Sequence, residues 1–195
     1  MSLFRALMAC CLIGLLTGCA GPAAPHAIPG ESARPTSDPS PTPASFNGPA
    51  RHLPRPQLPE AAKQNSEQGF EAFTQFWFDT ITYMRETGDP VPVSEISAPS
   101  CKMCERQVEK ARRLYDGGGW GIGPQRTVKG FESAMLPGAD ESVTGIYRFA
   151  EASSVTYSKA GDVGIRYTGG MSDGVQAIRA RFDEGKWVAF EVGPA

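Results

Sequence analysis

The distribution of proline most restricts what this chain of 195 residues can fold into. Residues 20–56 hold ten prolines, and their only large aliphatic side chains are Ile28 and Leu53. A segment of this composition buries too little apolar surface to offset the entropy lost on ordering, so we expect it to be disordered with a polyproline bias. Folded structure is therefore expected only in residues 57–195, a length typical of one domain.

The first nineteen residues have the pattern of an export signal. One basic residue, Arg5, precedes an apolar run over residues 6–16, which is about half as long as a membrane-spanning helix requires. The run ends in Leu16-Thr17-Gly18-Cys19, which resembles the lipobox of bacterial lipoproteins. This resemblance implies cleavage before Cys19 and attachment of diacylglyceryl and a further acyl chain such as palmitate, which together anchor a protein stably. The alternative is ordinary secretion, with Cys19 as a bystander in the signal.

These patterns divide the chain into three parts. A signal peptide occupies residues 1–18, a tether that begins at the lipid-bearing Cys19 occupies residues 19–56, and a globular domain occupies residues 57–195. An extended polyproline chain rises about 3.1 Å per residue, so the tether would reach on the order of 110 Å from the bilayer. We therefore expect a domain at the bacterial cell surface, on the extracytoplasmic face of the cell membrane.

Apolar periodicity predicts a long helix at the start of the domain. Asn65 or Ser66 would cap it, with Gln68 three residues after Asn65 as in a capping box, and Gly88 would end it. Its buried face repeats at spacings of three and four residues: Phe70, Phe73, Trp77, Ile81 and Met84.

Strands are expected in the second half of the domain. Four segments rich in β-branched and aromatic residues predict them: residues 127–136, 143–157, 175–182 and 187–192. A three-residue loop, Asp183-Glu184-Gly185, would join the last two into a hairpin. The apolar faces then match, with Ala180 opposite Val188 and Ile178 opposite Phe190, whereas a two-residue loop would not match them. The predicted class is α+β, with N-terminal helices packed on a curved antiparallel sheet of about four strands.

This order of elements resembles the cone of the nuclear transport factor two-like (cystatin-like) fold. Five segments are also similar to an uncharacterised family of actinobacterial lipoproteins that contains a domain of unknown function: Pro59-Glu60-Ala61-Ala62-Lys63, residues 69–73, Thr87-Gly88-Asp89, Ser100-Cys101-Lys102-Met103-Cys104 and Gly118-Gly119-Trp120. The resemblance implies an architecture and a location, and it implies no particular activity.

Cys101 and Cys104 are the only cysteines of residues 57–195. They open a second predicted helix that runs to about residue 116, with Ser100 as its cap and glycines 117–119 at its end. We expect a structural disulfide, because no strand of the thioredoxin type precedes the pair. Alternatively, Cys101 at a helix N-terminus would be the nucleophile of an extracytoplasmic thiol–disulfide oxidoreductase.

Few groups suited to catalysis or metal binding lie in residues 57–195. Both histidines, His26 and His52, lie in the expected tether, and two thiolates alone do not make a closed zinc site, so no metal or other cofactor is expected. Asp79 and Tyr83 share one helix face, and a cone-fold enzyme with a buried carboxylate, as in ketosteroid isomerases, is a further alternative. The 15 basic and 19 acidic residues form no basic cluster, which argues against nucleic-acid binding.

A non-catalytic binding or interaction domain is therefore the function that we expect. Its ligand would be a cell-wall component, a small molecule or a protein partner, and a homodimer across the open face of the sheet is one such partnership. The cavity or sheet face involved would be lined by large aromatic residues from both halves of the domain: Trp77, Trp120, Tyr147, Trp187 and Phe190.

Overall fold

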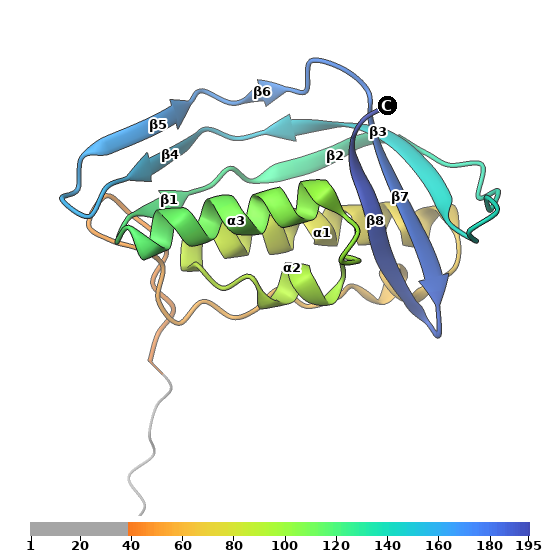
Figure 1. The fold of residues 1–195 in the computed structure, drawn as a ribbon, viewed down its shortest axis with the longest axis horizontal. Helices are drawn as coiled ribbons and strands as arrows, with labels where there is room; N and C mark the ends of the chain where they lie inside the picture. Colours follow the sequence, from red (N-terminus) through yellow and green to blue (C-terminus); the bar gives the residue numbers. More distant parts are fainter. Residues whose placement is uncertain (1–38) are drawn as a thin grey trace, which may run out of the picture. The chain divides into compact units, whose positions relative to one another are not determined.

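The helices of the computed structural model precede its strands, as the sequence predicts (Figure 1). They are the short 3₁₀ helix η1 (Glu60–Lys63) and the α-helices α1 (Glu67–Thr87), α2 (Val91–Glu95) and α3 (Lys102–Asp116). The structure describes residues 39–195, so the expected signal peptide and the lipid-bearing Cys19 lie outside the described residues. Within that range no helix is both long enough and apolar enough to cross a membrane.

Helix α1 begins and ends where the sequence places it. The Oγ of Ser66 accepts a hydrogen bond of 3.1 Å from the backbone N–H three residues further on, which caps the first turn. At the other end Gly88 takes a left-handed conformation, with φ of 79°, that a side chain would disfavour. The capping box predicted for Asn65 and Gln68 is wrong, because the helix starts one residue later than that box requires.

The segment between α1 and α3 differs in detail from the prediction. Helix α2 was not expected, and proline at its second position is compatible with a first helical turn. Helix α3 is capped by Cys101 rather than by Ser100, because the Sγ of Cys101 accepts a hydrogen bond of 3.3 Å from the N–H of Cys104.

The strands form two antiparallel sheets rather than one, and the fold class is α+β as predicted. One sheet has the order β2 (Arg126–Glu132), β3 (Val143–Glu151), β7 (Gln176–Asp183), β8 (Lys186–Pro194), and β6 (Gly170–Met171) also pairs with β3. The other has the order β1 (Trp120–Ile122), β4 (Ser154–Tyr157), β5 (Val163–Tyr167). The single strand predicted over residues 143–157 is divided, because the N–H of Ala152 donates to the carbonyl of Gln125 and the chain then enters the second sheet.

The hairpin of β7 and β8 differs from the prediction in loop length and register. Its loop has two residues, Glu184 and Gly185, whose φ angles of 47° and 80° suit a tight hairpin turn. A β-bulge then leaves Phe190 without a partner on β7 and realigns the apolar faces that a two-residue loop alone would offset. The observed pairs are Ala180–Ala189 and Ile178–Val192, in place of Ala180–Val188 and Ile178–Phe190.

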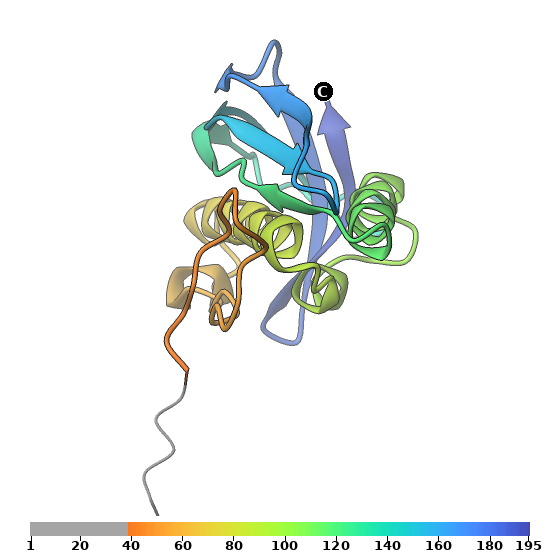
Figure 2. The ribbon, with the colours of Figure 1, turned by 90° about the vertical axis from the view of Figure 1, so that its left-hand side faces the viewer.

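The hydrophobic core lies between α1 and the five-stranded sheet. The Phe70 ring stacks on Trp187 with 4.6 Å between ring centroids, and Phe78 meets Tyr147 edge-on at 5.8 Å. Figures 1 and 2 show α1 and α3 side by side along the strands, so that α3 covers a separate part of them. The largest fully buried side chains are those of Tyr147, Phe70, Phe73, Ile81, Met84 and Ile178.

The last part of the expected tether is folded onto the domain. Thr42 and Arg51 exchange two backbone hydrogen bonds, of 2.8 and 2.9 Å, and the N–H of Ala50 donates to the carbonyl of Glu86 in α1 at 3.0 Å. The carbonyl of Ser45 accepts a 2.8 Å hydrogen bond from the indole of Trp120. Disorder up to residue 56 is therefore a wrong prediction, because backbone hydrogen bonds to the domain hold this segment without a core of its own.

Candidate functional site: a groove between helix α3 and the three-stranded sheet

A groove of about 290 Å³ is lined by residues of α3, the end of α1 and the three-stranded sheet. This volume is at the lower end of the range for small-molecule sites, roughly 300–1,000 Å³. Its lining combines apolar, hydroxyl, amide and cationic groups: Arg85, Gln107, Lys110, Ala111, Leu114, Gly121, Ser154, Thr156, Ile165 and Tyr167.

Two close contacts at the end of α1 fix the walls of this groove. The hydroxyl of Tyr115 donates to the carbonyl of Arg85 at 3.1 Å and so holds α3 against α1. Gly121 of β1 faces the same carbonyl, and a Cβ at this position would lie 2.9 Å from its oxygen. The absence of a side chain at Gly121 therefore lets the small sheet approach α1 closely.

Arg85 is one of two cationic residues that line the groove, and its guanidinium is only partly hydrogen-bonded. Its Nε donates to the carbonyl of Gly123 at 3.1 Å. Neither terminal amino group has a hydrogen-bond or ion-pair partner among residues 39–195, and neither is fully buried. Burial, followed by the nearby guanidinium of Arg126, lowers the pKa of Arg85. The side chain thus carries a positive charge in partly desolvated surroundings, with donors left over.

The carboxylate that acts on the charge of Arg85, that of Glu151, is already paired with another arginine. Glu151 pairs with the Nε of Arg126 at 2.5 Å, and both side chains are largely buried. The guanidinium of Arg126 also lies over the rings of Phe78 and Phe149, at 5.6 and 5.3 Å from their centroids. Two guanidinium groups therefore share one carboxylate, and the charge of Arg85 remains in excess.

The open side of the groove is formed by an edge strand. Every residue of β5 is exposed, and its apolar side chains alternate on one face, with Ile165 at 59% and Tyr167 at 56% exposure. Tyr167 also borders a second cavity of about 680 Å³ formed by the loop over residues 168–176. Strand β5 thus adds exposed apolar surface beside the groove.

Residues 40–193 match the model of a protein family of unknown function, DUF6318. The chain belongs to the DUF6318 family. No curated protein matches it.

Three solved structures resemble this DUF6318 chain at low sequence identity. The intermembrane-space region of the chloroplast protein ARC6 is 10% identical, with a TM-score of 0.49 over 67% of this chain and 98% of that one. Aln2 from a Streptomyces species is 13% identical, with a TM-score of 0.39 over 70% and 92%. A putative calcium/calmodulin-dependent protein kinase II association domain from Xanthomonas campestris is 15% identical, with a TM-score of 0.34 over 73% and 94%.

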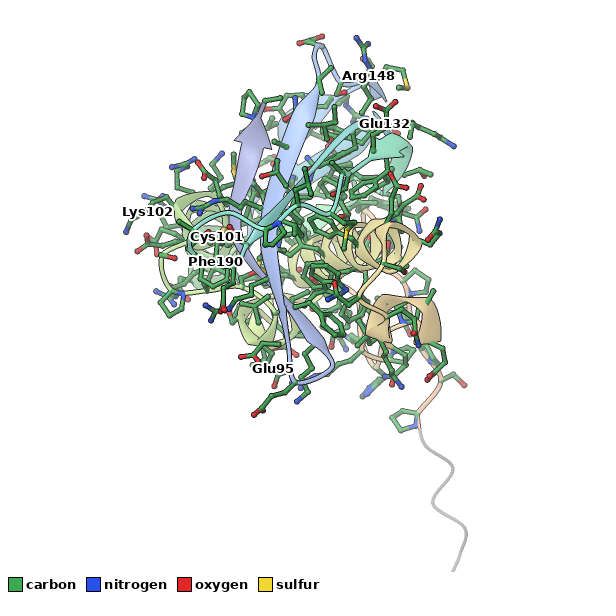
Figure 3. All side chains as sticks on the ribbon, turned by 90° about the vertical axis from the view of Figure 1, so that its right-hand side faces the viewer. Glu95, Cys101, Lys102, Glu132, Arg148 and Phe190 are labelled. Carbon is green, nitrogen blue, oxygen red and sulfur yellow. A yellow bond between two sulfur atoms is a disulfide. The ribbon has the colours of Figure 1, made fainter. Side chains whose placement is uncertain are left out.

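The aromatic residues predicted to line a cavity do not meet around one in the DUF6318 domain. Trp77, Tyr147 and Trp187 belong to the hydrophobic core, and Trp120, 7% exposed, stacks on Tyr157. Tyr147 also borders a cavity of about 290 Å³, whose lining includes none of the other four. Phe190 is half-buried beneath the guanidinium of Arg181, at 5.2 Å, and is labelled in Figure 3. Their size and periodicity reflect core packing, which a sequence pattern does not separate from cavity lining.

Cys101 and Cys104 are joined by a disulfide, with 5.2 Å between their Cα atoms. The two cysteines are 1% and 4% exposed and border a cavity of about 560 Å³ between α2 and α3. Exchange with an external thiol needs an accessible sulfur. The burial of Cys101 therefore favours a structural role for this disulfide over thiol–disulfide exchange.

Asp79 and Tyr83 are not brought together in the groove. The carboxylate of Asp79 accepts a hydrogen bond from Gln75 at 2.9 Å, and burial raises its pKa. The hydroxyl of Tyr83 instead points to Asp89, at 3.5 Å. Among residues 39–195 there is also no group of three or more histidine, cysteine, aspartate or glutamate side chains placed to hold a metal.

The residues that form the groove were not identified from the sequence. Strand β5 has a detectable signal, since Val163, Ile165 and Tyr167 alternate with Gly164 and Arg166. No comparable signal marks Arg85, because an arginine near the end of an amphipathic helix is ordinary. Only the tertiary packing of residues 39–195 shows that its terminal amino groups lack partners there.

Proposed function

We propose that this protein is a lipid-anchored lipoprotein of the bacterial cell surface whose folded domain binds a ligand without catalysis. The lipobox-like ending at Cys19 and the short apolar run before it support the anchoring. Since residues 42–56 fold onto the domain, the remaining spacer is about 22 residues, which as an extended chain reaches roughly 70 Å. Such a spacer is long enough to hold the domain clear of lipid headgroups.

The groove between α3 and the three-stranded sheet is the observation that carries the binding function. It combines an apolar wall, hydrogen-bonding side chains and a guanidinium whose terminal amino groups have no partner among residues 39–195, which together are typical of a ligand site. Histidine and carboxylates, the usual general bases, are not among its lining residues in the described part of the chain. The lining is therefore suited to recognition of a ligand.

Filling the groove tests this function directly. Gln107 on α3 is half-buried in the lining, so Gln107→Trp would occupy the groove without entering the core. Gln68→Trp, at an exposed position of α1, is the matched control. The melting temperature of the full chain would be measured with three classes of probe: peptidoglycan fragments, free amino acids and short carboxylic acids.

A ligand that binds only the folded state stabilises it. We therefore expect at least one class of probe to raise the melting temperature of the wild type and of Gln68→Trp. The melting temperature of Gln107→Trp should not rise, because its groove is filled. An equal rise in both variants would contradict the proposal, as would the absence of a rise with all three classes.

Anchoring has a separate test. The full chain, expressed in a bacterium that processes lipoproteins, should fractionate with membranes and incorporate labelled palmitate, and Cys19→Ala should do neither. A Cys19→Ala variant that still incorporates palmitate would contradict the proposed anchor.

A further inference from the structure

Groups of residues 39–195 do not balance the positive charges around the groove. Arg85 and Arg126 share the single carboxylate of Glu151, and that carboxylate is bound to Arg126. Lys110 adds a second cation to the lining, and no acidic residue of the described chain lines the groove. Partly desolvated charges are costly unless they are paired, so the groove is electrostatically suited to an anion.

The free donors of Arg85 also indicate the shape of that anion. Its Nε donates to the carbonyl of Gly123 at 3.1 Å, which holds one edge of the guanidinium. The two terminal amino groups then remain available side by side. This arrangement matches the two oxygens of a planar carboxylate, which arginine binds through parallel charge-assisted hydrogen bonds.

The rest of the groove is mainly suited to a small apolar group of the ligand. Ala111 and Leu114 of α3 line it together with Ile165 and Tyr167 of β5. The volume of about 290 Å³ admits a molecule with the size of an amino acid or a small aromatic acid. Ser154 and Thr156 supply hydroxyl groups for further polar contacts.

We infer that the groove is a receptor site for small carboxylates, in which the amino groups of Arg85 hold the carboxylate and an apolar or aromatic substituent lies against Leu114 and Ile165. This inference rests on the proposed binding function and adds the chemical class of the ligand. The carboxylate is either that of a free acid or that of the C-terminus of a short peptide, since both present the same group.

Calorimetric titration of the full chain with paired probes tests the inference. The free-acid probes are phenylacetate and isovalerate, and the peptide-terminus probe is N-acetyl-alanyl-leucine. Each acid is compared with its neutral amide, and inorganic phosphate is the anion without an apolar part. Loss of a charge-assisted hydrogen bond weakens binding at least about tenfold, so we expect each amide to bind that much more weakly than its acid.

Variants locate the site. Arg85→Gln should weaken binding of the acids at least about tenfold, and Arg85→Lys should weaken it less, because lysine keeps the charge but lacks the planar pair of donors. Arg148→Gln is the matched control, since this exposed arginine of β3 lines a different cavity (Figure 3). The comparison of acid with amide on the wild type does not depend on how well any variant folds.

The outcomes separate the inference from the proposed function. If acids and amides bind equally, and Gln107→Trp abolishes both, the groove binds ligands but the carboxylate inference is overturned. Phosphate binding as tight as that of the acids would also overturn it. If neither acids nor amides bind, the inference fails, and the thermal screen with the other probe classes still decides the proposed function. Preference for N-acetyl-alanyl-leucine over the free acids would identify a peptide terminus as the source.

Discussion

Replacement of Tyr147 by phenylalanine should leave the domain as stable as the wild type, or more stable, at neutral pH. The Tyr147 side chain is 1% exposed, and its hydroxyl has no hydrogen-bond partner in the structure of residues 39–195. Its ring packs against Phe78 and Phe131, at 5.8 and 6.4 Å between centroids, and phenylalanine retains that packing. A buried unpaired hydroxyl costs on the order of 1–3 kcal/mol, so the free energy of unfolding should rise by up to that amount.

The same residue should make the wild type sensitive to alkaline pH. Burial raises the pKa of Tyr147 above its ordinary value of about 10. Above pH 10 the unfolded chain therefore binds fewer protons at this residue than the folded chain, and stability falls as the pH rises. The loss is about 1.4 kcal/mol for this residue at pH 11, and Tyr147→Phe should lack it.

Urea unfolding of the full chain at pH 7 and at pH 11 measures both effects. Phe131→Leu is the matched control, because it alters the same aromatic cluster but keeps the Tyr147 hydroxyl and should keep the alkaline loss. A loss of more than about 1 kcal/mol in Tyr147→Phe at pH 7 would show that the hydroxyl is hydrogen-bonded in solution. Equal alkaline losses in the wild type and Tyr147→Phe would refute the pKa argument.

Two further predictions test the packing of the domain away from the groove. Replacing Cys101 and Cys104 together by serine should lower the free energy of unfolding by about 2 kcal/mol, because the disulfide closes a short loop. The far-ultraviolet circular dichroism should stay unchanged. An unaltered free energy of unfolding would contradict this prediction. Gly145→Ala should cost roughly 1–3 kcal/mol in urea unfolding, because its Cβ would overlap the ring of Phe131. Gly174→Ala, with open space around it, should be near neutral, and equal costs at the two glycines would be inconsistent with the observed packing.

The helical half of the fold was predictable because its signals are local. The spacing of apolar residues from Phe70 to Met84 follows one helix face, and Ser66 and Gly88 act within one turn of the helix ends. The disulfide between Cys101 and Cys104 is equally local, since three residues separate its partners. Such features need no knowledge of the rest of the chain.

The sheets were less predictable because their pairing depends on distant partners. The bulge at Phe190 decides the register of the hairpin, and it depends on which face of β8 meets the core. The division of residues 143–157 depends on a hydrogen bond between Ala152 and Gln125, which lie in different segments. Likewise, residues 42–56 are held by α1 and β1, elements that their own composition does not reveal.

The candidate site was the least predictable part, because it is defined by an arginine whose terminal amino groups have no hydrogen-bond or ion-pair partner among residues 39–195. The aromatic residues chosen from the sequence, such as Trp77 and Trp187, are large enough to mark either a core or a cavity, and packing places them in the core. Arg85 becomes distinctive only when Glu151 is found to pair with Arg126. Arg126 and Glu151 are cross-strand neighbours on β2 and β3, whereas Arg85 belongs to α1, so no local sequence pattern predicts how the three are arranged.

The most direct test of the groove as a carboxylate site is the nuclear magnetic resonance signal of the Arg85 Nε–H in the full chain, assigned with Arg85→Lys. The hydrogen bond of this group to Gly123 keeps it in a defined position beside the proposed ligand. Titration with phenylacetate should shift the signal in a saturable way, and phenylacetamide at the same concentrations should leave it in place. A signal that does not move while phenylacetate saturates the protein, or that moves equally with the amide, would contradict the proposed site.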